Sequence, residues 1–124
     1  VYVQSARDIY DLLGHEMGHL DREQIRVVTL DIRNGVIGIE IVAIGTLNSC
    51  MGHPREIFKN AIVKSAASII IVHNHPSGDA TPSPEDLSLT KRLIEVGKFL
   101  GIEVLDHVVI GDSCYSSIKD LMPQ

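Results

Sequence analysis

Aromatic residues and cysteine are scarce in this chain of 124 residues, which has no tryptophan, two phenylalanines, three tyrosines and two cysteines. The cysteines, Cys50 and Cys114, lie far apart and outside any Cys-x-x-Cys spacing, which excludes a disulfide framework and favours reduced thiols. No apolar run approaches the roughly 18 residues that a membrane span requires, and no secretory signal opens the chain. We therefore expect a cytoplasmic protein without a membrane anchor.

Basic residues are also few. The 11 lysines and arginines are outnumbered by 16 aspartates and glutamates, which gives a formal net charge of −5, and they are scattered along the chain. Binding to nucleic acid depends on clustered positive charge that neutralises phosphates. We therefore expect no nucleic-acid partner for this domain alone.

Aliphatic residues, by contrast, are abundant. The hydrophobic fraction is 44% and the aromatic fraction only 4%, so isoleucine, valine and leucine must build the core, as they do in α/β sheets. The length is sufficient for one core and too short for two. The sequence therefore predicts one α/β domain over residues 1–124.

Local patterns predict a mixture of helices and strands. Ser5 and Asp8 mark the start of a first helix, and Asn34-Gly35 signals a tight hairpin between antiparallel strands. Residues 68–72 form a continuous apolar run typical of a buried strand. We expect strands at residues 25–31, 36–47, 68–72, 102–110 and 113–118, and later helices that begin at Pro54 and span 86–100. The inward faces expected for these two helices are Ile57, Phe58, Ala61 and Ile62, and Leu89, Leu93, Val96 and Leu100.

Residues 73–86, HNHPSGDATPSPED, carry the strongest chemical signal in the chain. If His73 and His75 leave a strand still extended, alternation places both imidazoles on one face, about 7 Å apart along the chain, while Asn74 points away. Two neutral nitrogens and the Asp86 carboxylate are a ligand set for zinc that leaves a fourth tetrahedral position for water. We predict that His73, His75 and Asp86 bind one zinc ion, or another divalent metal, per chain.

The end of this run has a second explanation. Ser83, Pro84 and the acidic residues after them form a good helix N-terminus, with Ser83 as the cap. Capping alone explains the spacing of Ser83 and Asp86, but it does not explain the two histidines on the preceding strand. Asp86 can bind a metal while Ser83 still caps the helix.

A second zinc-like pattern, HEMGH at residues 15–19, formally matches the His-Glu-x-x-His motif of zincin proteases. On a continuous helix His15 and His19 would share one face. However, Gly14 and Gly18 weaken the helix here, and residues 20–22 are typical of its exit. We interpret this pattern as a chance match.

The spacing of His-x-His, seven residues and Ser-x-x-Asp resembles the JAMM motif of the MPN-domain metalloproteases. Further blocks resemble the RadC family, and the resemblance covers roughly residues 20–121. RadC-like proteins commonly carry a helix-hairpin-helix region before this domain, and the chain opens with valine, so we expect it to be the C-terminal domain of a longer protein. The blocks are GTLNS at 45–49, HPREIFK at 53–59, TKRL at 90–93 and GIEVLDH at 101–107.

The resemblance implies a mixed, curved β-sheet flanked by helices, of the JAMM/MPN type and related to the sheet of cytidine deaminases. It also implies a zinc-dependent hydrolase that cleaves peptide or isopeptide bonds in a peptide or protein substrate, with the metal acting as a Lewis acid and acidifying its water. JAMM proteins move the proton with a glutamate near the start of an early strand, and Glu23 matches this place best. Ser83 matches the serine that donates to the oxyanion.

For several residues the sequence is compatible with more than one role. Glu16, Glu40 and Glu56 compete with Glu23 as the base. His53 could cap the helix at Pro54 or line a substrate groove, and Asn48 could be a turn or groove residue. His107 could contact a metal ligand or be an ordinary buried histidine.

Other function classes are weighed by their motifs. Zinc deaminases need His-x-Glu with Pro-Cys-x-x-Cys, and the chain has neither. The alternative to a hydrolase is a non-catalytic metal-binding interaction module, since some MPN domains are such modules. In that case, the role in DNA repair with which RadC-like proteins are labelled would depend on DNA binding by a region that precedes this domain. No inserted segment suited to gripping ubiquitin is apparent, so ubiquitin is not predicted as the substrate.

Overall fold

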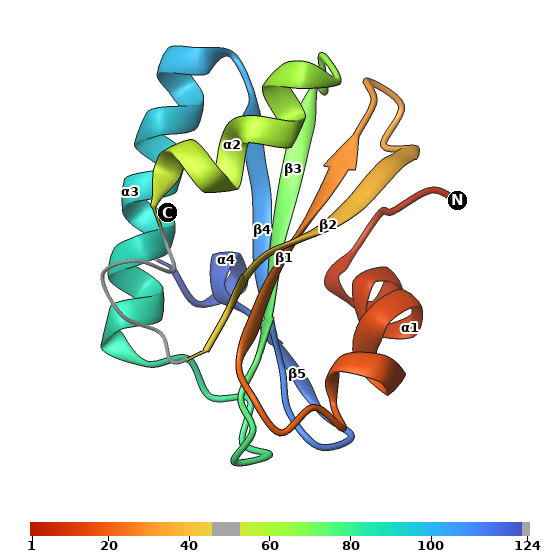
Figure 1. Ribbon diagram of the computed structural model, residues 1–124, viewed down its shortest axis with the longest axis vertical. Helices are drawn as coiled ribbons and strands as arrows, with labels where there is room; N and C mark the ends of the chain where they lie inside the picture. Colours follow the sequence, from red (N-terminus) through yellow and green to blue (C-terminus); the bar gives the residue numbers. More distant parts are fainter. Residues whose placement is uncertain (46–52, 123–124) are drawn as a thin grey trace.

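The computed structural model describes residues 1–45 and 53–122. The chain folds into a mixture of helices and strands, as the sequence predicts (Figure 1). The elements are α1 (Ala6–Met17), β1 (Gln24–Leu30), β2 (Val36–Ile44), α2 (Pro54–Val63), β3 (Ser68–Asn74), α3 (Pro84–Leu100), β4 (Glu103–Ile110), β5 (Tyr115–Ser117) and α4 (Ile118–Leu121).

Five strands form one open sheet in the order β2-β1-β3-β4-β5. β1 pairs antiparallel with both β2 and β3, β3 pairs parallel with β4, and β4 pairs antiparallel with β5. Figure 1 shows α1 on one face of the sheet and α2, α3 and the short α4 on the other. This mixed sheet flanked by helices confirms the predicted fold class and is consistent with a JAB/MPN fold.

The central strand β3 is buried along its whole length, which confirms the prediction from its apolar run. Its side chains alternate between two cores because successive residues of a strand point to opposite faces. Ile70 and Val72 pack toward α1, whereas Ile69 and Ile71 pack toward α2 and α3. The next residue on the second side is His73, so the histidine continues a buried apolar row.

The inward faces of α2 and α3 were predicted only in part. Ile57, Phe58 and Ala61 are buried, but Ile62 is 56% exposed because it lies one position beyond the narrow stripe that meets the sheet. On α3, Leu93 is buried and Leu100 is 44% exposed. The buried positions of α3 also include two polar residues that an apolar pattern cannot identify, and the full set is Asp86, Thr90, Leu93 and Gly97.

The predicted hairpin is present, but its turn is longer than the two-residue turn expected from Asn34-Gly35. Residues 31–35 connect the strands because the Asp31 carboxylate accepts hydrogen bonds from the backbone N–H groups of Arg33 and Gly35. Asn34 has a φ of 64°, which asparagine tolerates well.

The chain end and the second strand also differ in detail. β5 stops at Ser117, whose hydroxyl accepts from Asp120 N–H and caps α4, a helix not anticipated from the sequence. Residues 46–47, predicted as the end of the second strand, lie outside the described residues. No helix in the described part of the chain is both long and apolar enough to cross a membrane.

Candidate metal centre

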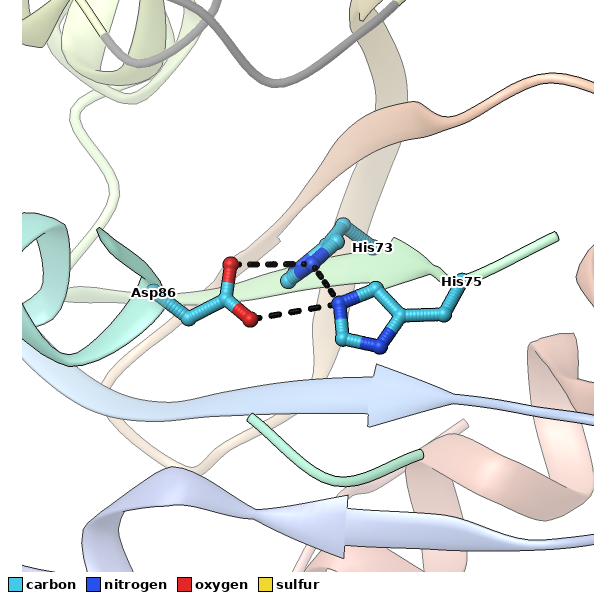
Figure 2. A group of neighbouring side chains, drawn as sticks. All are labelled: His73, His75 and Asp86. Atoms are coloured by element: carbon cyan, nitrogen blue, oxygen red, sulfur yellow. Dashed lines mark hydrogen bonds and ion pairs between the residues drawn. The ribbon is translucent and has the colours of Figure 1, made fainter. Parts of the chain in front are cut away.

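Three side chains from two elements converge at the end of β3 (Figure 2). His73 Nε2 lies 3.0 Å from His75 Nε2 and 3.2 Å from Asp86 Oδ1, and His75 Nε2 lies 3.2 Å from Asp86 Oδ2. Among the described residues, this is the group of three or more histidine, cysteine or acidic side chains close enough to hold one ion. The structure thus brings together the three predicted ligands.

The local backbone explains why the two histidines converge. The extended chain continues past β3, because His75 N–H donates to Ile110 O at 2.9 Å, so His73 and His75 share one face. Gly78, with a φ of 91°, then turns the chain, and Asp112 N–H donates to Gly78 O at 2.8 Å. This tight loop returns the chain to α3, whose first turn carries Asp86.

Asp86 is held by the cap of its own helix. Ser83 Oγ accepts from Asp86 N–H at 3.1 Å, and Asp86 Oδ2 accepts from Ser83 N–H at 2.8 Å, which makes a reciprocal capping box. The capping role of Ser83 is confirmed, and it leaves the hydroxyl proton of Ser83 available to another acceptor. The cap therefore fixes the direction in which the Asp86 carboxylate faces the histidines.

The electrostatics of the site favour an ionised carboxylate. Burial raises the pKa of Asp86, but the close contacts of its carboxylate with the imidazoles of His73 and His75 outweigh burial and hold this pKa well below its usual range. The hydrogen bond with Asp86 raises the pKa of His75, although burial opposes the shift. In the absence of a metal, the ionised Asp86 carboxylate therefore favours the protonated form of His75.

A second buried layer supports His73. His107, fully buried on β4, places its Nε2 2.7 Å from His73 Nδ1 and its Nδ1 2.7 Å from Thr90 Oγ1. Burial, together with the charge of His73, lowers the pKa of His107 well below its usual value. His107 is thus a buried, hydrogen-bonded histidine, and one of its partners is the predicted metal ligand His73. Thr90 was missed, because nothing in its sequence context distinguishes it from any polar helix residue.

Glu23 reaches the same site through the register of the sheet. Ile25 pairs with His73 in the antiparallel β1–β3 ladder, and the same register continued by two residues places Glu23 opposite His75. Asn74 fixes this start of β1, since its side chain accepts from Gln24 N–H at 2.7 Å and donates to Arg22 O at 3.0 Å. Asn74 points away from the metal ligands, as predicted, but its clamp on the backbone around Glu23 was missed.

Glu23 and Ser83 both line a pocket of about 370 Å³ together with His75, and Pro76, Ser77 and Glu85 complete its wall. A neighbouring pocket of about 450 Å³ shares Glu23 and Pro76 in its lining. Glu23 Oε2 is buried without a hydrogen-bond partner among the described residues. The two residues predicted to be catalytic therefore lie together beside the candidate metal ligands.

The competing glutamates have other environments. Glu16 pairs with Arg26, on the sheet face that α1 covers. Glu40 pairs with Lys64, and Glu56 is exposed in the first turn of α2. None of these three carboxylates belongs to the group of converging ligands in the described residues.

The remaining sequence candidates lie away from the ligands. His15 lies in the last turn of α1 and His19 lies beyond the helix, and both residues are exposed. Their rings meet edge to face with centroids 5.2 Å apart. His53 caps α2 by accepting from Arg55 N–H at 3.3 Å, which confirms its helix-cap reading. Cys114 is an exposed free thiol, while Asn48 and Cys50 lie outside the described residues.

The donor set fits a divalent metal. The three ligand atoms lie within 4.8 Å of one another, and Asp86 Oδ1 is buried without a hydrogen-bond partner in the described part of the chain. A buried carboxylate oxygen without a partner is costly unless a cation or a donor meets it. The arrangement is therefore compatible with a metal-dependent hydrolase.

Comparison with known proteins identifies the family of the chain. The family model described as the RadC-like JAB domain matches residues 3–122. A UPF0758 protein of Moorella thermoacetica is 54% identical over 118 residues, which cover 95% of this chain and 52% of that protein. A UPF0758 protein of Syntrophomonas wolfei is 56% identical over 117 residues, 94% of this chain and 49% of that protein.

A third relative, a UPF0758 protein of Caldanaerobacter subterraneus, is 55% identical over 118 residues, with 95% of this chain and 51% of that protein covered. The chain thus spans about half the length of these curated relatives. Because the family match extends over nearly all of the chain, the chain belongs to the family of RadC-like JAB domains.

Proposed function

We propose that this domain is a zinc-dependent peptidase or isopeptidase, in which His73, His75 and Asp86 hold the metal. The observation that carries the proposal is the shared pocket, where Glu23, Ser83 and His75 lie in one wall. A bound zinc ion would supply Lewis acidity and make a water molecule acidic enough to act near neutral pH. The choice of zinc rests on the set of two imidazoles and one carboxylate.

Glu23 has the properties required of the proton carrier. It borders the ligands without being one of them, and its buried Oε2 has no competing hydrogen bond within the described residues. As water attacks the carbonyl carbon, the Glu23 carboxylate takes a proton from that water. When the C–N bond breaks, the same group gives the proton to the departing amine, which restores the carboxylate.

Ser83 is suited to stabilise the tetrahedral intermediate. Its oxygen accepts the Asp86 N–H, so the hydroxyl proton can point into the pocket toward the developing oxyanion. A fixed donor at this place stabilises negative charge more in the transition state than in the substrate. The capping bond supplies the necessary rigidity, because it holds the Ser83 side chain against the start of α3.

The shape of the site supports an extended peptide as substrate. Two pockets share Glu23 and Pro76 in their linings, one of them reaching Asp21, Arg22 and Gly45 and the other reaching Ser83 and Glu85. We infer that a bound peptide would extend from one pocket into the other across Glu23. Such an arrangement accommodates chain on both sides of a scissile bond.

The test separates proton transfer from metal binding. After a peptide-library screen identifies a cleaved sequence, Glu23→Gln should keep wild-type zinc content and stability and lose hydrolysis by at least roughly a hundredfold, as expected for a general base. Glu56→Gln is the matched control, because Glu56 is exposed on α2, and it should cleave like the wild type. Equal cleavage by Glu23→Gln, or a zinc-loaded wild type that cleaves no library member, would contradict the proposal.

A further inference from the structure

We propose that Thr90 and His107 fix the tautomer of His73, so that its Nε2 presents a lone pair to the metal. Three buried side chains from α3, β4 and β3 form a chain of hydrogen bonds that ends at this ligand. The inference rests on the proposed metal site but not on the reaction that the site performs. Its basis is the direction in which each hydrogen bond must run.

The direction is set at Thr90. Its Oγ1 lies 2.8 Å from Asp86 O, and a carbonyl can only accept, so the single hydroxyl proton of Thr90 is used in this bond. Toward His107, 2.7 Å away, the same oxygen can therefore only accept. His107 must carry a proton on Nδ1.

His107 then determines which ring donates in its hydrogen bond with His73. His107 is completely buried, and its two ring nitrogens contact a hydroxyl and another imidazole instead of a carboxylate, so burial favours its neutral form. A neutral imidazole has one N–H, and here it lies on Nδ1. His107 Nε2 is thus an acceptor, and His73 must donate to it from Nδ1 across 2.7 Å.

This hydrogen-bond direction determines the state of His73 Nε2, the proposed ligand atom. With its proton on Nδ1, His73 keeps an unprotonated Nε2, and this is the atom that faces His75 Nε2 and Asp86 Oδ1. The reverse direction would place a proton on Nε2, where a metal has to bind. Histidine ligands commonly donate their second N–H to a fixed acceptor for this reason.

His75 reaches the same state by a shorter route. Its Nδ1 lies 2.9 Å from Asp79 O, and this carbonyl can only accept, so His75 also keeps Nε2 for the metal. His73 lies in the buried central strand, between β1 and β4, where the backbone carbonyls accept hydrogen bonds from neighbouring strands. Thr90 and His107, from α3 and β4, therefore provide an acceptor for the Nδ1 proton of His73, as the loop carbonyl of Asp79 does for His75.

The test compares Thr90→Val, which keeps the shape and removes the hydroxyl, with Thr90→Ser, which keeps the hydroxyl. In the metal-free protein, 15N NMR of the imidazoles should show His73 with its proton on Nδ1 in the wild type and in Thr90→Ser. In Thr90→Val the population with the proton on Nε2 should rise, and zinc affinity should fall by roughly 10- to 100-fold. If Thr90→Val does not fold, Thr90→Ala tests the same hydroxyl.

The alternatives give different results. A purely structural role of Thr90 would lower the melting temperature of Thr90→Val and leave both the tautomer and the zinc affinity of folded protein unchanged, which would overturn the inference. A wild type with its His73 proton on Nε2 would overturn it as well. A wild type with the Nδ1 proton that takes up no zinc would instead contradict the proposed metal site, while supporting the direction of the hydrogen bonds.

Discussion

The Asp86 carboxylate serves two purposes at once. Its Oδ2 accepts the Ser83 N–H that caps α3, and both of its oxygens face the imidazoles of His73 and His75. The low pKa of Asp86 and the raised pKa of His75 describe the same interaction from its two sides. In the metal-free domain, the Asp86 carboxylate therefore favours the positive charge of protonated His75 where a metal cation would otherwise lie.

This pairing predicts a dependence of stability on pH. Because folding lowers the pKa of Asp86, its carboxylate stabilises the fold above the unfolded pKa of 3.8, and this stabilisation is lost as the pH falls through the folded pKa. Because folding raises the pKa of His75, its protonated form stabilises the fold below the unfolded pKa of 6.5, and this stabilisation is lost as the pH rises through the folded pKa. The pair therefore stabilises most between these two values. For metal-free protein, the loss of unfolding free energy caused by Asp86→Asn should be larger near about pH 5.5 than near about pH 8.5.

Denaturant unfolding of both proteins at the two pH values provides the measurement. Zinc binding should show the opposite trend on the alkaline side, because the metal binds the deprotonated imidazole of His75. A larger effect of Asp86→Asn at the higher pH would contradict the assigned pairing.

Residues of the site differ in how far the sequence could identify them. His73, His75 and Asp86 lie in one short run, so the alternation of a strand and the start of a helix were enough to predict them. Thr90, His107 and Asn74 act through partners on other elements, and their roles depend on the β3–β4 register and on how α3 packs. No pattern local to these residues carries that information.

At the scale of elements, the site depends on a close contact between the loop after β3 and the turn after β4. A Cβ at Gly111 would lie 2.4 Å from Gly78 O and 2.9 Å from Ala80 N, so only glycine allows this approach. The same loop presents Asp79 O to His75. The β4–β5 turn therefore helps to orient a metal ligand that it does not touch.

Gly111→Ala should displace this loop, destabilise the domain by about 1–3 kcal/mol and weaken zinc affinity. Gly97→Ala is the matched control, because a Cβ there would lie equally close, 2.4 Å, to a backbone oxygen, that of Ile102, on the far part of α3. It should destabilise by a similar amount without changing the zinc affinity of folded protein. Thermal unfolding and zinc titration of both variants test the distinction, and equal losses of affinity would refute it.

Elements were predicted well where burial agreed with pattern, as in β3, and less well where polar groups faced inward. Of the apolar positions predicted to face inward on α3, Leu89, Leu93 and Val96 pack against the core and Leu100 is exposed. The apolar pattern missed the polar residues Asp86 and Thr90, which also turn inward to reach the histidines. The turn of the first hairpin was lengthened by the Asp31 side chain, which substitutes for backbone acceptors. In both cases the simpler signal did not include a side-chain hydrogen bond.

At the scale of the whole molecule, the sheet order explains the position of the site. β3 is central and parallel to β4, so the carboxyl ends of these strands meet at one edge of the sheet, and β1 runs antiparallel to present its beginning there. The candidate ligands, the proposed base Glu23 and the helix cap Ser83 thus come from separate parts of the chain.

The charge of the molecule leads to a prediction about partners. With a formal net charge of −5, the domain alone should bind duplex DNA no better than an unrelated acidic protein of similar size, which is the appropriate control. Gel-shift and fluorescence anisotropy assays at physiological salt provide the measurement. A specific shift at submicromolar protein would contradict this expectation.

The metal site proposed for this domain, made of His73, His75 and Asp86, is tested most directly by elemental analysis of purified protein after zinc loading and removal of excess metal. The measurement compares the wild type, His75→Ala and the double variant His15→Ala/His19→Ala. We expect about one zinc per chain in the wild type and in the double variant, and none in His75→Ala. A wild type that takes up no transition metal, or a double variant that loses its zinc, would contradict the proposed site.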